Sequence, residues 1–213
     1  KKFRRGGKMT ICDSCKKIEV FGSVEKIKEK TKKSGNKYFV MRHGETEANI
    51  KGIVCSKPSG KWHLNEKGIK QVKDVAEKLS KENIDLIFTS DFTRTLETTE
   101  IIREKIGLKK EKVITDVRLR EIGAYSFDNQ NWAEYHKLYT KNIESFNSHV
   151  KDDESYQDVK NRATSFLYEI EEKFQGKNIL FVTHGGPAWL MFAGAGGKNV
   201  EETLNMIRNR EDS

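Results

Sequence analysis

Short apolar runs alternate with longer amphipathic stretches along most of the chain. Four runs have the length and composition of buried β-strands: residues 38–41, 84–89, 113–119 and 178–183. Three helices are expected over residues 65–79, 90–106 and 155–174. The first and third stretches repeat apolar side chains every three or four positions, which is the spacing of one helix face. Strands that alternate with helices predict an α/β fold, a three-layer α/β/α sandwich with a mostly parallel sheet.

Capping and helix-terminating residues mark the ends of the predicted helices. Ser90 and Asp91 are N-cap candidates for the second helix, and Gly107 is placed to close it. Gly176 is placed to terminate the third helix, and Pro187 suits the first turn of another helix after the last strand.

The segment between Gly123 and Asp153 is irregular and rich in aromatic residues. Two interpretations stay open for it. It is either a helical insertion that covers a site or a set of helices packed on the edge of the core.

The formal charge of +8 is unevenly distributed. Residues 1–37 contain 13 Lys/Arg and four Asp/Glu, whereas the remainder contains 27 and 28. Residues 31–37 are polar and contain glycine, as linkers do, so we predict a basic appendage over 1–37 and a domain over 38–213. The appendage suits contact with tRNA or another polyanion, although a solvated lysine-rich surface fits it equally well. No apolar run reaches 18 residues, which predicts no membrane span.

The three cysteines, Cys12, Cys15 and Cys55, are too sparse and uneven in number for a disulfide framework. They favour a reducing, cytoplasmic location. Cys12 and Cys15 have the spacing of half a zinc site. No second pair or nearby histidine completes it, so a reduced turn without metal is favoured.

Chemically complementary side chains follow all four predicted strands. Arg42 and His43 come directly after the first strand, Arg94 follows the second, Glu121 the third and His184 the fourth. The carboxyl ends of parallel strands meet at one edge of a sheet, so these side chains are expected in one pocket. Arginines match phosphoryl oxygens, a neutral imidazole can attack phosphorus, and a carboxyl group can protonate the leaving oxygen. The set therefore predicts phosphoryl transfer.

Five sequence blocks carry a resemblance to a known family: RHGETEAN, HLNEKGIKQV, SDFTRTLETT, LREIG and VTHGG. Together they resemble the histidine phosphatase superfamily, also called phosphoglycerate-mutase-like, over residues 38–194. The resemblance implies metal-independent hydrolysis of a small phosphorylated substrate, without a cofactor, through a phosphohistidine. Glu121 and His184 are 63 positions apart, fewer than in glycolytic mutases of this fold. This spacing favours a phosphatase over the alternative, a phosphoglycerate-type mutase.

The resemblance also implies a role for each catalytic candidate. His43 is implied as the nucleophile, and Arg42 and Arg94 as the clamp on the phosphoryl oxygens. His184 is implied as a further donor to those oxygens, and Glu121 as the proton donor.

Three more residues are implied as substrate-binding contacts: Asn49, Gly44 and Gly185. Asn49 touches the phosphate or orders the first loop, and the two glycines let the backbone approach the ligand. After the acid, GAYSFDNQ departs from the family's Gly-x-Trp-Glu-Gly, so the substrate is not inferred from that loop. Family members commonly continue into another strand, so the C-terminal edge of the sheet can be missing here.

The segment Cys12–Glu29, CDSCKKIEVFGSVEKIKE, resembles part of isoleucyl-type class I aminoacyl-tRNA synthetases. Together with the basic arm and the first residue Lys1, it suggests an alternative. The phosphatase-like domain would be inserted in, or fused to, such a synthetase as a catalytic or phosphate-ligand-binding module. Retention of all five catalytic candidates argues for catalysis, because a purely structural role does not need them.

Overall fold

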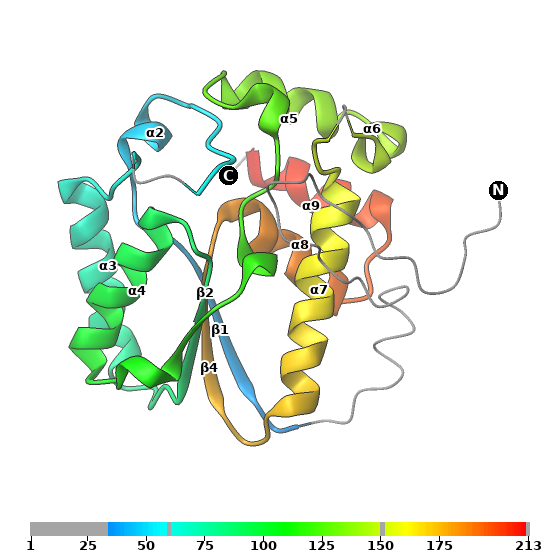
Figure 1. Cartoon of the computed structure of the whole chain (residues 1–213). Helices are drawn as coiled ribbons and strands as arrows, with labels where there is room; N and C mark the ends of the chain where they lie inside the picture. The colour runs from blue at the N-terminus through cyan, green and yellow to red at the C-terminus, as the bar shows by residue number, and fades with distance from the viewer. Residues whose placement is uncertain (1–33, 59–60, 150–151, 212–213) are drawn as a thin grey trace.

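The computed structural model describes residues 34–58, 61–149 and 152–211, and its centre is one β-sheet (Figure 1). The strands lie in the order β1 (Lys37–Arg42), β4 (Asn178–Thr183), β2 (Leu86–Thr89) and β3 (Val113–Thr115). Every neighbouring pair is parallel, which confirms the sheet expected from the sequence.

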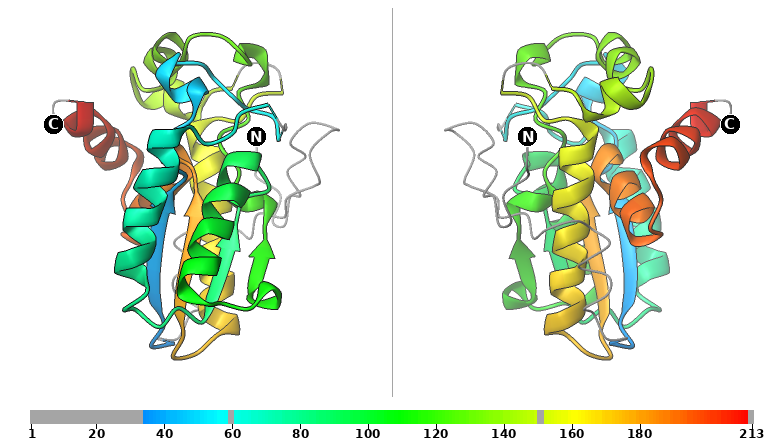
Figure 2. Two further views of the ribbon diagram at one scale, coloured as in Figure 1. Left: turned by 90° about the vertical axis from the view of Figure 1, so that its left-hand side faces the viewer. Right: turned by 90° about the vertical axis from the view of Figure 1, so that its right-hand side faces the viewer.

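Helices cover both faces of this sheet, which confirms the three-layer sandwich (Figure 2). One face carries α3 (Glu66–Leu79) and α4 (Thr93–Ile106), and the other carries α7 (Tyr156–Lys173) and α8 (Gly185–Ala195). In the described part of the chain, no helix is both long and apolar enough to span a membrane.

The central strand β4 belongs to both cores because successive side chains of a strand point to opposite faces. Leu180 and Val182 join the core that α3 and α4 complete. Ile179 and Phe181 join the core that α7 completes, together with Met191 of α8. All four β4 side chains are at most 1% exposed, so the middle of the sheet is a fixed base for the loops that follow its strands.

Helix ends follow local capping chemistry, with one exception. Ser155 caps α7, and Gly107 ends α4 at a φ of 69°, a left-handed conformation that glycine adopts readily. The prediction that Ser90 or Asp91 caps α4 is wrong. The N-cap is Phe92, without a side-chain bond, because the Ser90 and Asp91 side chains make hydrogen bonds elsewhere.

The third strand is shorter than the predicted range of 113–119. It ends at Thr115, and a 3₁₀ turn, η2 (Val117–Leu119), follows. The Asp116 carboxylate accepts a hydrogen bond from the backbone N–H of Arg118 at 2.8 Å. This local bond competes with strand pairing and turns the chain toward the carboxyl end of the sheet.

Short elements complete the fold: α2 (Glu47–Ile50), η1 (Lys110–Lys112), η3 (Tyr125–Phe127), α5 (Trp132–Tyr139), α6 (Ile143–Asn147) and α9 (Val200–Glu211). Helices α5 and α6 form the insertion and lie over the carboxyl end of the sheet (Figure 1). Within the insertion, Tyr135 and Phe146 are fully buried in the core, whereas Trp132 and His136 line a cavity. Both interpretations of the insertion therefore hold, because it packs on the core and covers a site.

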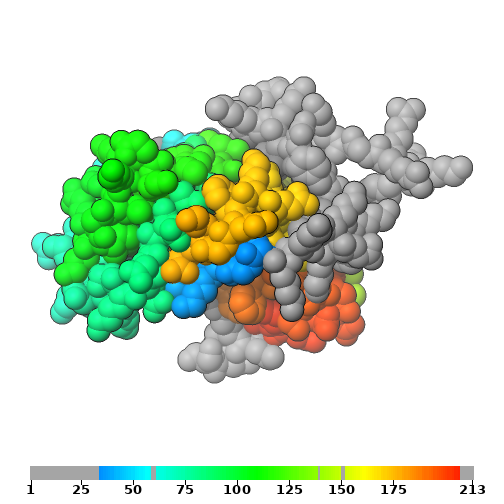
Figure 3. Space-filling view, turned by 90° about the horizontal axis from the view of Figure 1, so that it is seen from below, coloured from blue at the N-terminus to red at the C-terminus, as the bar shows by residue number. Residues whose placement is uncertain are grey.

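The described chain begins at the amino-terminal end of the sheet, which faces the viewer in Figure 3. There the N–H of Lys37 donates to the carbonyl of Lys177 at 2.8 Å, and the N–H of Gly176 donates to the carbonyl of Ser34 at 3.0 Å. Residues 34–37, predicted as the end of a linker, are thus fixed to the loop between α7 and β4. The rest of the predicted appendage, with its cysteine pair, lies outside the described residues.

Two glycines let the loop after β1 pack against the start of α3. A Cβ on Gly68 would lie 2.1 Å from the carbonyl oxygen of Glu45, and one on Gly44 would lie 2.6 Å from that of Gly68. We predict that Gly68→Ala lowers the free energy of unfolding by about 1–3 kcal/mol, because the two backbone segments must separate.

The matched control is Gly196→Ala, whose Cβ would meet no atom closer than 3.4 Å. Its free energy of unfolding should change by less than about 0.5 kcal/mol. Urea-unfolding curves measure both variants, and equal losses would contradict the packing argument.

Candidate active site

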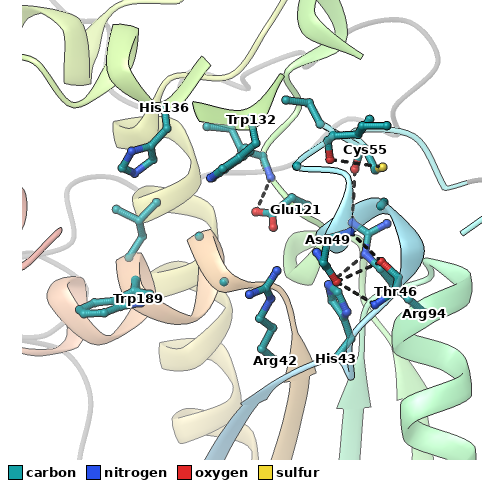
Figure 4. A pocket seen from close by; sticks show the side chains of 18 of the residues that line it. Arg42, His43, Thr46, Asn49, Cys55, Arg94, Glu121, Trp132, His136 and Trp189 are labelled. Carbon is teal, nitrogen blue, oxygen red and sulfur yellow. Dashed lines mark hydrogen bonds between the residues drawn. The ribbon is translucent and has the colours of Figure 1, made fainter. Parts of the chain in front are cut away.

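All five side chains predicted to carry catalysis lie at the carboxyl end of the sheet. Arg42 and His43 lie at the end of β1, Arg94 in the first turn of α4, Glu121 after η2 and His184 after β4. All but His184 line one cavity of about 550 Å³ (Figure 4). His184 lies beside it, with its ring centroid 5.2 Å from that of His43. The parallel sheet thus brings together residues that are up to 142 positions apart in the chain.

The imidazole of His43 is held at both nitrogens. Its Nδ1 lies 2.7 Å from the carbonyl oxygen of Gly44, which accepts only a hydrogen bond, so Nδ1 carries the proton. The lone pair is therefore on Nε2, which accepts a hydrogen bond from Nε of Arg94 at 3.0 Å. Burial and the positive charges of Arg94 and Arg42 lower the pKa of His43 to about 3. The ring is neutral at neutral pH, as a nucleophile must be.

Arg94 supplies a fixed positive charge beside Nε2 of His43. Its guanidinium lies 4.6 Å from the centre of the Phe92 ring, and Nη2 donates to the carbonyl of Cys55 at 3.3 Å. Burial lowers the pKa of Arg94, but a guanidinium keeps its charge in proteins. An anionic group bound at His43 would meet this charge in a site largely shielded from water.

His184 is fully buried, and its Nε2 lies 2.9 Å from Oγ of Ser90. Burial and the charge of Arg94 lower its pKa well below the ordinary value, so this ring is neutral too. Among the described residues, Nδ1 of His184 has no hydrogen-bond partner. Because a buried nitrogen without a partner costs free energy, Nδ1 is a candidate contact for a ligand at His43.

The start of α8 packs against two other candidates. Arg42 is exposed at the end of β1 and reaches into the cavity (Figure 4). A Cβ on Gly185 would lie 3.8 Å from Nε of Arg42, an ordinary contact. A Cβ on Gly186 would lie 2.9 Å from Oε1 of Glu121. Gly186, which sequence reasoning did not single out, therefore makes room for the Glu121 carboxylate.

Two residues implied as ligand contacts have local structural roles. Gly44 does not line the cavity; its N–H donates to Oγ1 of Thr98 at 3.2 Å, and it packs on Gly68 without space for a side chain. Asn49 does line the cavity, and its Oδ1 also accepts from the N–H of Thr46 at 3.0 Å in a capping box. Asn49 thus helps to fix the first turn of α2.

A buried ion pair, missed by sequence reasoning, holds the loop that carries Glu121. Arg162 donates from Nε to Glu154 at 2.7 Å and from Nη2 to the carbonyl of Glu121 at 3.1 Å. Glu154 accepts from the N–H of Gly123 at 2.8 Å. The two peptide groups that follow Glu121 are therefore fixed. Arg162 falls on the apolar face predicted for residues 155–174, and a charge at such a position was the available signal.

Aromatic rings form the wall of the cavity opposite Arg42 and His43 (Figure 4). The ring wall, as we call it, consists of Trp132, His136, Tyr156 and Trp189. Trp132 and His136 lie in the aromatic segment between Gly123 and Asp153, for which covering a site was one of two interpretations. Sequence reasoning gave Tyr156 and Trp189 no role at the site. The two remaining histidines, His63 and His149, do not line the cavity.

Cys55 also lines the cavity, and burial raises the pKa of its thiol. Within residues 34–58, 61–149 and 152–211, no cluster of three or more His, Cys, Asp or Glu side chains could hold a metal ion. The candidate half zinc site, Cys12 and Cys15, lies outside these ranges.

Comparisons with known proteins bear on this site. The family model of the histidine phosphatase superfamily (branch 1) matches residues 38–210. Phosphoglycerate mutase-like protein 4 of Arabidopsis thaliana is 34% identical over 179 residues, 80% of this chain and 76% of that protein. The metal-independent phosphoserine phosphatase of the same plant is 27% identical over 184 residues, 81% and 76% of the two chains.

A solved structure shows the same fold. A mycobacterial glucosyl-3-phosphoglycerate phosphatase in complex with VO₃ aligns with a TM-score of 0.68 at 23% identity. The alignment covers 78% of this chain and 84% of that one.

The lowered pKa of His43 makes stability depend on pH. Between about pH 6.5 and pH 3, His43 is protonated in the unfolded chain but not in the folded protein. The unfolded state binds more protons in this window, so the free energy of unfolding falls as the pH falls. From pH 7 to pH 5, we predict that the wild type loses about 2 kcal/mol more than His43→Asn.

Urea unfolding of both proteins at the two pH values measures this difference. His184 is present in both, and burial and Arg94, the two largest causes of its lowered pKa, are unchanged in the variant, so most of its effect cancels. Equal losses for wild type and variant would show that His43 titrates at its ordinary pKa in the folded protein.

Proposed function

The chain belongs to the histidine phosphatase superfamily, branch 1, and we propose that it hydrolyses phosphomonoesters without a metal ion, through a phosphohistidine on His43. The observation that carries the proposal is the state of this imidazole. Nδ1 keeps its proton against the Gly44 carbonyl, and the Nε2 lone pair lies 3.0 Å from Nε of Arg94. A neutral ring whose free nitrogen lies beside a guanidinium suits attack on a phosphoryl group that the guanidinium binds.

In the first step, Nε2 of His43 forms a bond to phosphorus as the bond to the leaving oxygen breaks. Arg94 exchanges its hydrogen bond with Nε2 for one with a phosphoryl oxygen, and Arg42 binds another. Nδ1 of His184, which lacks a partner among the described residues, contacts the same group. Glu121 gives its proton to the leaving oxygen, so the alcohol departs uncharged.

In the second step, water attacks the phosphohistidine. The Glu121 carboxylate accepts a proton from the water, and the electron pair of the P–N bond returns to Nε2 of His43. Inorganic phosphate leaves, and both residues regain their starting states. The alternative, a phosphoglycerate-type mutase, shares the first step and differs only in transferring the phosphoryl group to an alcohol.

The test is hydrolysis of 4-nitrophenyl phosphate in EDTA by wild type, His43→Ala and the control His149→Ala. We expect turnover by wild type and control, and a loss of at least about 1,000-fold in His43→Ala. Acid-labile ³²P on the wild-type protein alone would identify the phosphohistidine. Turnover that needs a metal or survives in His43→Ala, or no turnover by folded wild type, would refute the proposal. Transfer of phosphate to added glycerol, measured in parallel, distinguishes the mutase.

From sequence alone, we also propose that residues 1–37 contact tRNA or another polyanion in the cytoplasm. Their 13 Lys/Arg and four Asp/Glu support it, because clustered basic residues attract phosphate chains. The full chain should bind tRNA more tightly than a chain lacking residues 1–33, and less tightly as salt rises. Equal affinities would refute this contact. Fusion to an isoleucyl-type synthetase stays a prediction, which the flanking sequence of the gene would test.

A further inference from the structure

The cavity has two chemically different halves. Near His43, the guanidinium groups of Arg42 and Arg94 provide positive charge. Across the cavity lie Trp132, His136 and Trp189 of the ring wall (Figure 4), and Tyr156 is the fourth aromatic residue of the lining. A phosphoryl group bound at His43 therefore directs the rest of the substrate toward the rings.

The ring wall is built from three elements that are fixed in place. The N–H of Trp132 donates to the carbonyl of Gly52 at 2.7 Å, which ties the start of α5 to the loop after α2. The rings of Trp132 and His136 lie 5.7 Å apart at 34°, and those of His136 and Tyr156 lie 6.1 Å apart at 76°. Trp189 comes from α8, whose first turn also contacts Glu121 and Arg42. The wall is thus preformed rather than assembled by a mobile loop.

The charges of the cavity argue against an acidic leaving group. Among the described residues that line it, the only Lys or Arg side chains are Arg42 and Arg94, both at the end near His43. The one acidic side chain in this lining belongs to Glu121, which the proposed first step uses as an acid. A carboxylate on the substrate would lose water against the rings without gaining a cationic partner, which costs free energy.

The shape and chemistry of the rings favour an aromatic substrate. Flat rings pack against tryptophan in offset or edge-on arrangements and gain more than the area they bury. A cavity of about 550 Å³ is in the size range of drug-sized ligands, and so has room for a phosphoryl group and a ring together.

We infer that the leaving alcohol carries an uncharged aromatic ring, which packs against Trp132 and Trp189, and that the cavity rejects small carboxylate-bearing phosphomonoesters. Phosphoserine, the substrate in the name of one relative, is among those rejected. The inference rests on the proposed function and specifies its substrate class.

The first experiment compares kcat/KM for benzyl phosphate, O-phosphoserine and glycerol 1-phosphate. All three release a primary alcohol, so none has the reactive leaving group of an aryl phosphate. We expect benzyl phosphate to exceed phosphoserine by about 10–100-fold. An equal or higher value for phosphoserine would overturn the inference.

The second experiment locates the discrimination. Trp132→Ala and Trp189→Ala should each lower the ratio of kcat/KM for benzyl phosphate to that for glycerol 1-phosphate by about 10-fold or more. Trp62→Ala is the matched control, because Trp62 does not line the cavity. Its ratio should equal that of the wild type. An unchanged ratio in both cavity variants would overturn the role of the wall.

In the alternative interpretation, the His136 side chain binds a carboxylate of the substrate. If phosphoserine is the better substrate and His136→Gln removes that preference, His136 binds the carboxylate and the inference is wrong. If no phosphomonoester is turned over, titration calorimetry compares benzylphosphonate with phosphonoacetate. Tighter binding of benzylphosphonate would support the ring wall while refuting the proposed function; tighter binding of phosphonoacetate would refute both.

Discussion

The imidazole of His43 is fixed at both nitrogens, and the rest of the site is arranged around it. The carbonyl of Gly44 accepts a hydrogen bond from Nδ1–H, so the lone pair stays on Nε2 beside the guanidinium of Arg94. That carbonyl is itself held in place, because Gly44 packs on Gly68 without space for a side chain. The chemistry of the ring thus depends on close contact between the loop after β1 and the start of α3.

The opposite layer fixes the carboxyl group in a different way. Arg162 and Glu154, both in or next to α7, hold the two peptide groups that follow Glu121. A buried ion pair gains little net stability, since both charges lose water, but its directional bonds favour a single loop conformation. The nucleophile and the acid are therefore positioned by helices on opposite faces of one sheet. Two of the four rings in the ring wall, Trp132 and His136, come from the insertion, so they can vary without disturbing either group.

The sequence by itself determined the order of strands and helices and the residues at the strand ends. Hydrophobic periodicity is a local property, so it predicted four strands and the parallel sheet that they form. The sequence blocks predicted Arg42, His43, Arg94, Glu121 and His184, because each lies at a fixed offset from a strand. The errors were local: Asp116 ended the third strand early, and Phe92 rather than Ser90 or Asp91 capped α4.

Only the tertiary structure decided which other side chains reach the site. Residues 185–195, GGPAWLMFAGA, are almost entirely apolar, so no pattern shows that Trp189 faces the cavity. Arg162 and the loop of Glu121 are 41 positions apart, and their contact depends on how α7 packs against the sheet. The protonation state of His43 follows from burial and from Arg94, 51 positions away. Local sequence encodes elements and residue types, whereas burial and distant contacts set orientation, charge and substrate space.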